Sequence, residues 1–124
     1  MRLSALLKSS GIPQGLADPE ITSLCYDSRK AEKGCLFFAL PGKNHDGAAF
    51  AAQAAEKGAA AIVAEKSLPQ SDCPLVIVSN ARQAMADIAS AFYSHPSLSL
   101  KAVGITGTNG KTTTAFLVKH LLDA

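Results

Sequence analysis

The sequence predicts an α/β protein in two parts: a small α/β domain, residues 1–97, and the first strand, glycine-rich turn and helix of a second domain, residues 98–124. Short apolar runs of strand length alternate with helical patterns throughout the first part. The stretch His95-Pro96-Ser97 ends the last of these helices and marks the boundary. After it, Ala102-Val103-Gly104-Ile105 is expected to form a strand that leads into the turn and a final helix.

The elements of the first part follow from local patterns. Leu3, Leu6 and Leu7 share one face of an expected first helix. Gly58 is placed to end another helix, since glycine readily adopts the left-handed conformation that follows a helix. The expected strands span 21–26, 35–40, 60–64 and 74–79, and the other expected helices span 48–57 and 81–94.

Composition excludes several classes of function. A net charge of +2 is too small to indicate a nucleic-acid surface or an anionic membrane surface. No apolar run approaches the length of a membrane span. Cys25, Cys35 and Cys73 are odd in number and far apart, which disfavours a zinc site and indicates free thiols in a reducing cytoplasm.

The glycine-rich turn carries the strongest functional signal. Gly107 and Gly110 lack a Cβ, so the backbone can approach an anion, and the helix behind presents free amides. Lys111 is placed to reach the β- and γ-phosphates of ATP, and the Thr112 hydroxyl to bind Mg²⁺. Ile105 stands where the usual spacing has another glycine. The predicted ATP-binding residues are Gly107, Thr108, Asn109, Gly110, Lys111, Thr112 and Thr113.

Two polar segments follow expected strands in the first part. In Asp27-Ser28-Arg29, either of the first two residues can simply cap a turn, whereas the functional interpretation gives Ser28 a phosphate or hydroxyl contact and Arg29 an anion. In Lys43-Asn44-His45-Asp46, the aspartate can cap the next helix, whereas the first three residues can line a ligand at the carboxyl edge of the sheet. The residue types alone leave both interpretations open.

Together these segments resemble the amino-terminal end of a Mur ligase, most closely the MurE type. The shared segments are Asp27-Ser28-Arg29, residues 34–42, Asp46-Gly47, residues 54–60 and residues 104–114. The resemblance covers essentially the whole chain, which would be about the first quarter of such an enzyme. We therefore expect a fragment that lacks the carboxyl-terminal domains of a longer protein.

The resemblance implies an activity and a division of labour. The longer enzyme would use ATP and Mg²⁺ to add the third peptide residue, diaminopimelate or lysine, to UDP-N-acetylmuramoyl-L-alanyl-D-glutamate through an acyl phosphate, in peptidoglycan synthesis. The first domain would hold the uridine nucleotide end of this substrate through Tyr26, Ser28, Lys43, Asn44 and His45. Tyr26 departs from the smaller or aliphatic residue of other members. No catalytic residue is expected within these 124 residues, so the chain alone is expected to be inactive.

Three alternatives stay open. A MurF-type ligase, which adds a dipeptide, shares the Asp-Ser-Arg and Asp-Gly pattern. The chain could instead be a uridine-nucleotide-binding module without chemistry of its own. A regulatory ATP-binding switch would require residues 101–124 to fold alone, which is disfavoured because a parallel strand needs neighbouring strands.

Overall fold

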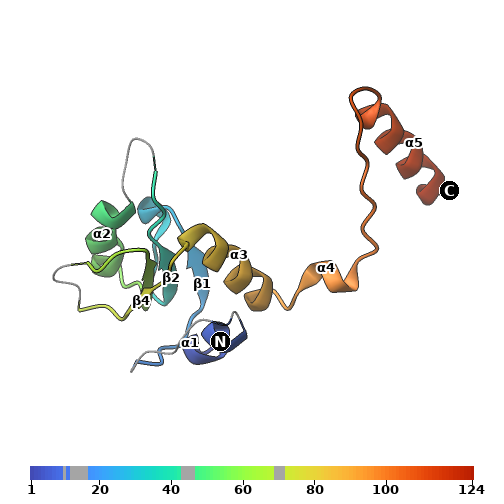
Figure 1. Ribbon diagram of the computed structural model, residues 1–124. Coiled ribbons are helices and arrows are strands. Elements are labelled where there is room, and N and C mark those ends of the chain that lie inside the picture. The colour runs from blue at the N-terminus through green and yellow to red at the C-terminus, as the bar shows by residue number, and fades with distance from the viewer. Residues whose placement is uncertain (10, 12–16, 43–46, 69–71) are drawn as a thin grey trace.

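A four-stranded parallel sheet forms the centre of the computed structural model, which describes residues 1–9, 11, 17–42, 47–68 and 72–124. The strands follow one another across the sheet in chain order, β1-β2-β3-β4 (Figure 1). Their bounds are β1 (Ser23–Cys25), β2 (Cys35–Phe38), β3 (Ala61–Ala64) and β4 (Leu75–Ile77). The predicted α/β class is confirmed, and each strand lies within a segment expected to be extended.

Most of the described helices also lie where the sequence patterns predict them, but the short helix at Pro96–Ser99 was not predicted, since His95-Pro96-Ser97 was expected only to end the preceding helix. Their bounds are α1 (Leu3–Ser9), α2 (Ala51–Glu56), α3 (Ala81–Phe92), α4 (Pro96–Ser99) and α5 (Lys111–Asp123), with short 3₁₀ turns η1 (Ser28–Lys30) and η2 (Gly47–Phe50). The helix expected at 48–57 therefore begins as a 3₁₀ turn. Gly58 follows its last turn with φ of +91°, as predicted. Asn80 caps α3 by accepting a hydrogen bond from the amide of Gln83.

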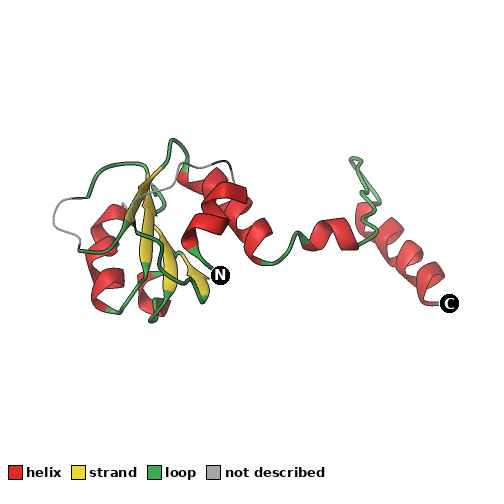
Figure 2. Ribbon diagram, turned by 90° about the horizontal axis from the view of Figure 1, so that it is seen from below, coloured by secondary structure: helices red, strands yellow, loops and turns green. Residues whose placement is uncertain are grey.

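Two cores lie on opposite faces of the sheet. Successive side chains of a strand point to opposite faces, so β2 and β3 contribute to both. On one face, Leu36 and Val63 pack with the buried leucines of α1 and with Ile88 of α3. On the other face, Phe37 and Ile62 pack with the alanines of α2. The result is a three-layer domain with the sheet between its helices (Figure 2).

The strand expected at residues 102–105 is not formed. Residues 101–107 have no regular structure, and in the described part of the chain no strand pairs with them. A parallel strand gains its stability from ladder hydrogen bonds and from burial between neighbours, and Val103 here is 68% exposed. The prediction was therefore wrong for this chain: an extended segment leads to α5, which lies apart from the sheet (Figure 1).

We expect residues 1–97 to fold without the segment that follows them. The two cores take no described residue beyond Phe92, and no described residue of α4 or α5 is buried. We therefore expect a chain of residues 1–97 to melt within about 2 °C of the 124-residue chain in a circular dichroism experiment. Removing residues 1–9 serves as the control, because the loss of three buried leucines should abolish the transition. A much lower melting temperature for 1–97 would place residues 98–124 in the same folding unit.

Candidate functional site

A hollow of about 600 Å³ lies at the carboxyl ends of β1 and β2. Three segments line it: the turn after β1, the end of β2, and the stretch from η2 into α2. Ligands of parallel α/β domains bind at this edge because loops from neighbouring strands meet there. The volume suits a small organic molecule, since such sites measure about 300–1,000 Å³.

The turn after β1 is held together by Asp27. Its carboxylate accepts hydrogen bonds from the amide, Nε and Nη2 of Arg29, at 3.0, 3.0 and 2.8 Å. These contacts lower the pKa of Asp27 to about 2, so the carboxylate is ionised at neutral pH. The expectation that Asp27 caps a turn is confirmed, since it is the N-cap of η1. The guanidinium of Arg29 thereby takes part in forming the turn.

Ser28 is the buried polar residue of this turn, only 7% exposed. Its hydroxyl donates a hydrogen bond to Oε1 of Gln53 in α2, at 2.7 Å. Both residues line the hollow. Because the hydroxyl hydrogen is engaged with Gln53, the Ser28 oxygen has lone pairs left that can accept a hydrogen bond from a donor.

Two aromatic side chains line the same hollow. Tyr26 follows β1 and is 69% exposed, and Phe50 ends η2 and is 38% exposed. Partly exposed rings of this kind can stack on a planar ligand ring. Sequence reasoning selected Tyr26 but missed Phe50 and Gln53. The available signal for Gln53 was a single polar side chain in an otherwise alanine-rich run.

The other loop predicted to contact the substrate follows β2 and precedes η2. Lys43, Asn44 and His45, like Asp46, lie outside the described residues. The described residue that follows them, Gly47, lines the hollow and donates its amide to the carbonyl of Leu40, at 3.0 Å.

The glycine-rich turn has backbone angles that favour glycine at two positions. Gly107 has φ of +149° and Gly110, the residue before α5, has φ of +77°. The helical ladder begins with the bond from the amide of Thr114 to the carbonyl of Gly110, at 2.9 Å. The amides of residues 111–113 therefore precede the ladder, and no acidic side chain stands in this first turn. This arrangement fits an anionic group such as a phosphate.

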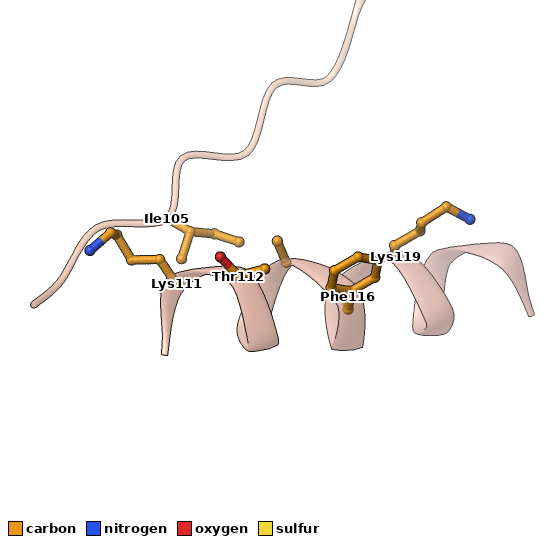
Figure 3. A pocket seen from close by; sticks show the side chains of 6 residues that line it. Ile105, Lys111, Thr112, Phe116 and Lys119 are labelled. Carbon is orange, nitrogen blue, oxygen red and sulfur yellow. The ribbon is translucent and has the colours of Figure 1, made fainter. Parts of the chain in front are cut away.

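The side chains around this turn are shown in Figure 3. A hollow of about 400 Å³ lies between Ile105 and one side of α5. The Thr112 hydroxyl points toward the side of Ile105, whereas Lys111 turns back and its ammonium donates to the carbonyl of Gly107. Predicted residues 107–113 thus gather at one end of α5, while the hollow itself runs along the helix past Phe116.

The described residues include no disulfide, no cluster of metal ligands and no membrane-spanning helix. Cys25, Cys35 and Cys73 are free, and burial raises the pKa of the Cys35 and Cys73 thiols. Among described side chains, no three of histidine, cysteine, aspartate or glutamate gather as metal ligands. Each described helix is too short or too polar to cross a lipid bilayer.

A match to a protein family covers most of this sheet domain. Residues 20–93 match the model of the Mur ligase family, catalytic domain, which is more than half of the chain. The chain therefore belongs to the Mur ligase family. The match contains β1 to β4, α2 and the turn with Tyr26 and Ser28, and it ends before the glycine-rich turn.

Individual relatives extend the similarity over the glycine-rich turn. The UDP-N-acetylmuramoyl-L-alanyl-D-glutamate–2,6-diaminopimelate ligase of Bacillus licheniformis is 44% identical over 120 residues, covering 97% of this chain and 24% of the relative. The ligase of the same name from Cytophaga hutchinsonii is 47% identical over 111 residues, covering 86% of this chain and 23% of the relative. The chain thus spans about a quarter of the length of these relatives.

Solved structures with a similar fold are also Mur ligases. MurF from Acinetobacter baumannii has a TM-score of 0.68 and 27% identity, covering 90% of this chain and 25% of that protein. MurF from Thermotoga maritima, in complex with ADP, has a TM-score of 0.58 and 31% identity, covering 74% of this chain and 21% of that protein.

Proposed function

We propose that this chain is the amino-terminal part of an ATP-dependent ligase of peptidoglycan synthesis. The longer protein would add the third residue, diaminopimelate or lysine, to UDP-N-acetylmuramoyl-L-alanyl-D-glutamate. The observation that carries this proposal is the hollow at the carboxyl edge of the sheet, which both Tyr26 and Ser28 line. The names of relatives 44–47% identical to this chain support the choice of substrate.

Residues 1–97 would hold the uridine nucleotide end of that substrate. Tyr26 and Phe50 offer rings that can stack on the base, and Ser28 offers an acceptor for a base or ribose donor. Lys43, Asn44 and His45 remain proposed contacts, on the strength of the family resemblance. Neither nucleic acid nor a membrane is proposed as a partner.

Residues 107–113 would hold ATP. The amides at the start of α5 and the ammonium of Lys111 would bind and neutralise the β- and γ-phosphates, and the hydroxyl of Thr112 would bind Mg²⁺. ATP would supply the phosphoryl group that activates the substrate carboxylate. Catalysis itself is proposed to need the rest of the longer protein. Free thiols and a nucleotide substrate support a cytoplasmic location.

Titration calorimetry with UDP-N-acetylmuramoyl-L-alanyl-D-glutamate tests the proposed substrate site. The 124-residue chain should bind it, and Ser28→Ala should weaken binding by roughly 3- to 10-fold, the value of one hydrogen bond. Ser99→Ala is the control, because this exposed serine of α4 donates its hydroxyl within its own turn, to the carbonyl of Pro96, and does not line the hollow. An undetectable affinity of the unmodified chain, or an unchanged affinity after Ser28→Ala, would refute the proposed site.

A MurF-type ligase is the second candidate, because solved MurF structures share this fold. The higher identity of the diaminopimelate-adding relatives, 44% against 27%, supports the first candidate. In the longer protein, turnover of the dipeptide substrate with a single amino acid would favour the first. Turnover of a tripeptide substrate with D-alanyl-D-alanine would favour the second.

A further inference from the structure

Helix α2 contacts the turn η1 through two polar side chains that stand on one helix face. Gln53 and Lys57 are four residues apart, so their side chains point the same way. Gln53 accepts the hydroxyl of Ser28, as described above. The ammonium of Lys57 donates to the carbonyl of Ser28, at 2.8 Å, and to the carbonyl of Arg29, at 3.0 Å.

Within the turn, the carbonyl of Ser28 accepts a hydrogen bond from the amide of Ala31, at a long 3.4 Å. The ammonium of Lys57 adds a shorter bond to the same carbonyl and one to the carbonyl of Arg29. A cation at the end of a helical turn also interacts favourably with the backbone dipoles. The bonds that the Asp27 carboxylate makes lie within the turn and fix its shape. The turn is held against the sheet domain from two sides. The thiol of Cys25 in β1 donates to the carbonyl of Asp27, at 3.0 Å, and Gln53 and Lys57 bind Ser28 from the side of α2.

Lys57 contacts the turn η1 from outside the hollow. Gln53 and Ser28 belong to the lining of the hollow, whereas Lys57 reaches the turn through backbone carbonyls. A change at Lys57 would therefore remove a support of Ser28 without removing a side chain that lines the hollow. Gly58 ends the helix directly after Lys57, which places the side chain at the last turn of α2.

We propose that Lys57 is a positioning residue for uridine nucleotide binding, which it supports by holding Ser28 at the wall of the hollow. The inference rests on the proposed function, because it concerns the affinity of that same site. Lys57 is exposed, and its role depends on two charge-assisted hydrogen bonds and not on core packing.

Titration of the 124-residue chain with UDP and with UDP-N-acetylmuramoyl-L-alanyl-D-glutamate tests this role. Lys57→Met should weaken both affinities by roughly fivefold, because the methionine fills the same space without the donors. Lys57→Arg should restore both to within about twofold, since a guanidinium can donate to two carbonyls. Lys66→Met, at an exposed lysine after β3, is the matched control for the loss of one charge and should bind as the unmodified chain does.

A double-mutant cycle separates positioning of Ser28 from a direct attraction between Lys57 and the substrate phosphates. In a Ser28→Ala chain, Lys57→Met should cost less than about twofold in further affinity, because the group that it positions is gone. Losses that multiply, or an unchanged affinity of the single Lys57→Met variant, would overturn the proposal. So would a loss of affinity that accompanies a large fall in melting temperature.

If the unmodified chain binds neither ligand, the proposed function fails, and this inference falls with it. If Ser28→Ala weakens binding while Lys57→Met does not, the uridine site stands and the positioning role alone is refuted.

Discussion

Lys111→Ala in the longer ligase should lower turnover by at least about a hundredfold, the typical cost of removing one preorganised group that stabilises developing charge. Lys111 is the first residue of α5, and its ammonium already lies over the glycine-rich turn, on the carbonyl of Gly107. The substitution should leave the first turn of α5 helical, because alanine has the highest helix propensity. The affinity for the uridine substrate should stay within about twofold, because Lys111 lies outside the hollow of the sheet domain. Release of ADP and titration calorimetry measure the two effects.

Lys119→Ala is the matched control for this experiment. Lys119 stands on the same helix beside the same 400 Å³ hollow, but its ammonium pairs with Asp123 at the far end of α5. An exposed pair of this kind contributes little, so turnover should change by less than about twofold. A fall in uridine-substrate affinity as large as the fall in turnover after Lys111→Ala would contradict the division of labour between residues 1–97 and the glycine-rich turn.

Gly47→Ala should destabilise the sheet domain by roughly 2–4 kcal/mol, as overpacking against backbone atoms does. A Cβ at this position would lie 2.6 Å from the amide nitrogen and from the carbonyl oxygen of Leu40, and 2.7 Å from the carbonyl carbon of Ala39. These backbone atoms cannot move freely, because the amide of Ala39 donates to Val63 of the neighbouring strand, at 2.9 Å. Urea or thermal unfolding of the 124-residue chain measures the change.

Gly104→Ala provides the control for a glycine in open space. A Cβ there meets no heavy atom within 4 Å, and its φ is outside the left-handed range. The expected change is below about 0.5 kcal/mol. If Gly47→Ala leaves the stability unchanged, the close approach of Gly47 to the end of β2 does not exist in the folded protein.

Since Gly47 also lines the hollow, the affinity for the uridine substrate should fall with the stability.

Local sequence patterns were sufficient for most of the sheet domain. The spacing of Leu3, Leu6 and Leu7 predicted a helix with one buried face, and all three are buried. The apolar run from Cys35 predicted a strand at 35–40, and β2 forms within it with all four residues buried. Gly58 marked the end of α2 because helix ends require a particular backbone conformation. These features depend on neighbours a few residues away along the chain.

The candidate site was only partly predictable for the same reason. The motif residues Tyr26 and Ser28 were identified, but the network that holds Ser28 joins it to Gln53, 25 residues away, and to Lys57, 29 residues away. The pattern of a single sequence does not show which helix packs against which turn. Phe50 was missed because an aromatic residue near a helix start has the same pattern whether it fills a core or lines a site.

The sequence by itself determined the family, the order of strands and helices, and a glycine-rich turn ahead of a final helix, because each depends on residue types at fixed spacing. The tertiary structure alone decided that residues 102–105 do not form a strand, since strand formation depends on a partner and not on apolar character. It also decided that Gln53 and Lys57 hold the turn of Ser28, because that contact exists only once β1, β2 and α2 have packed together.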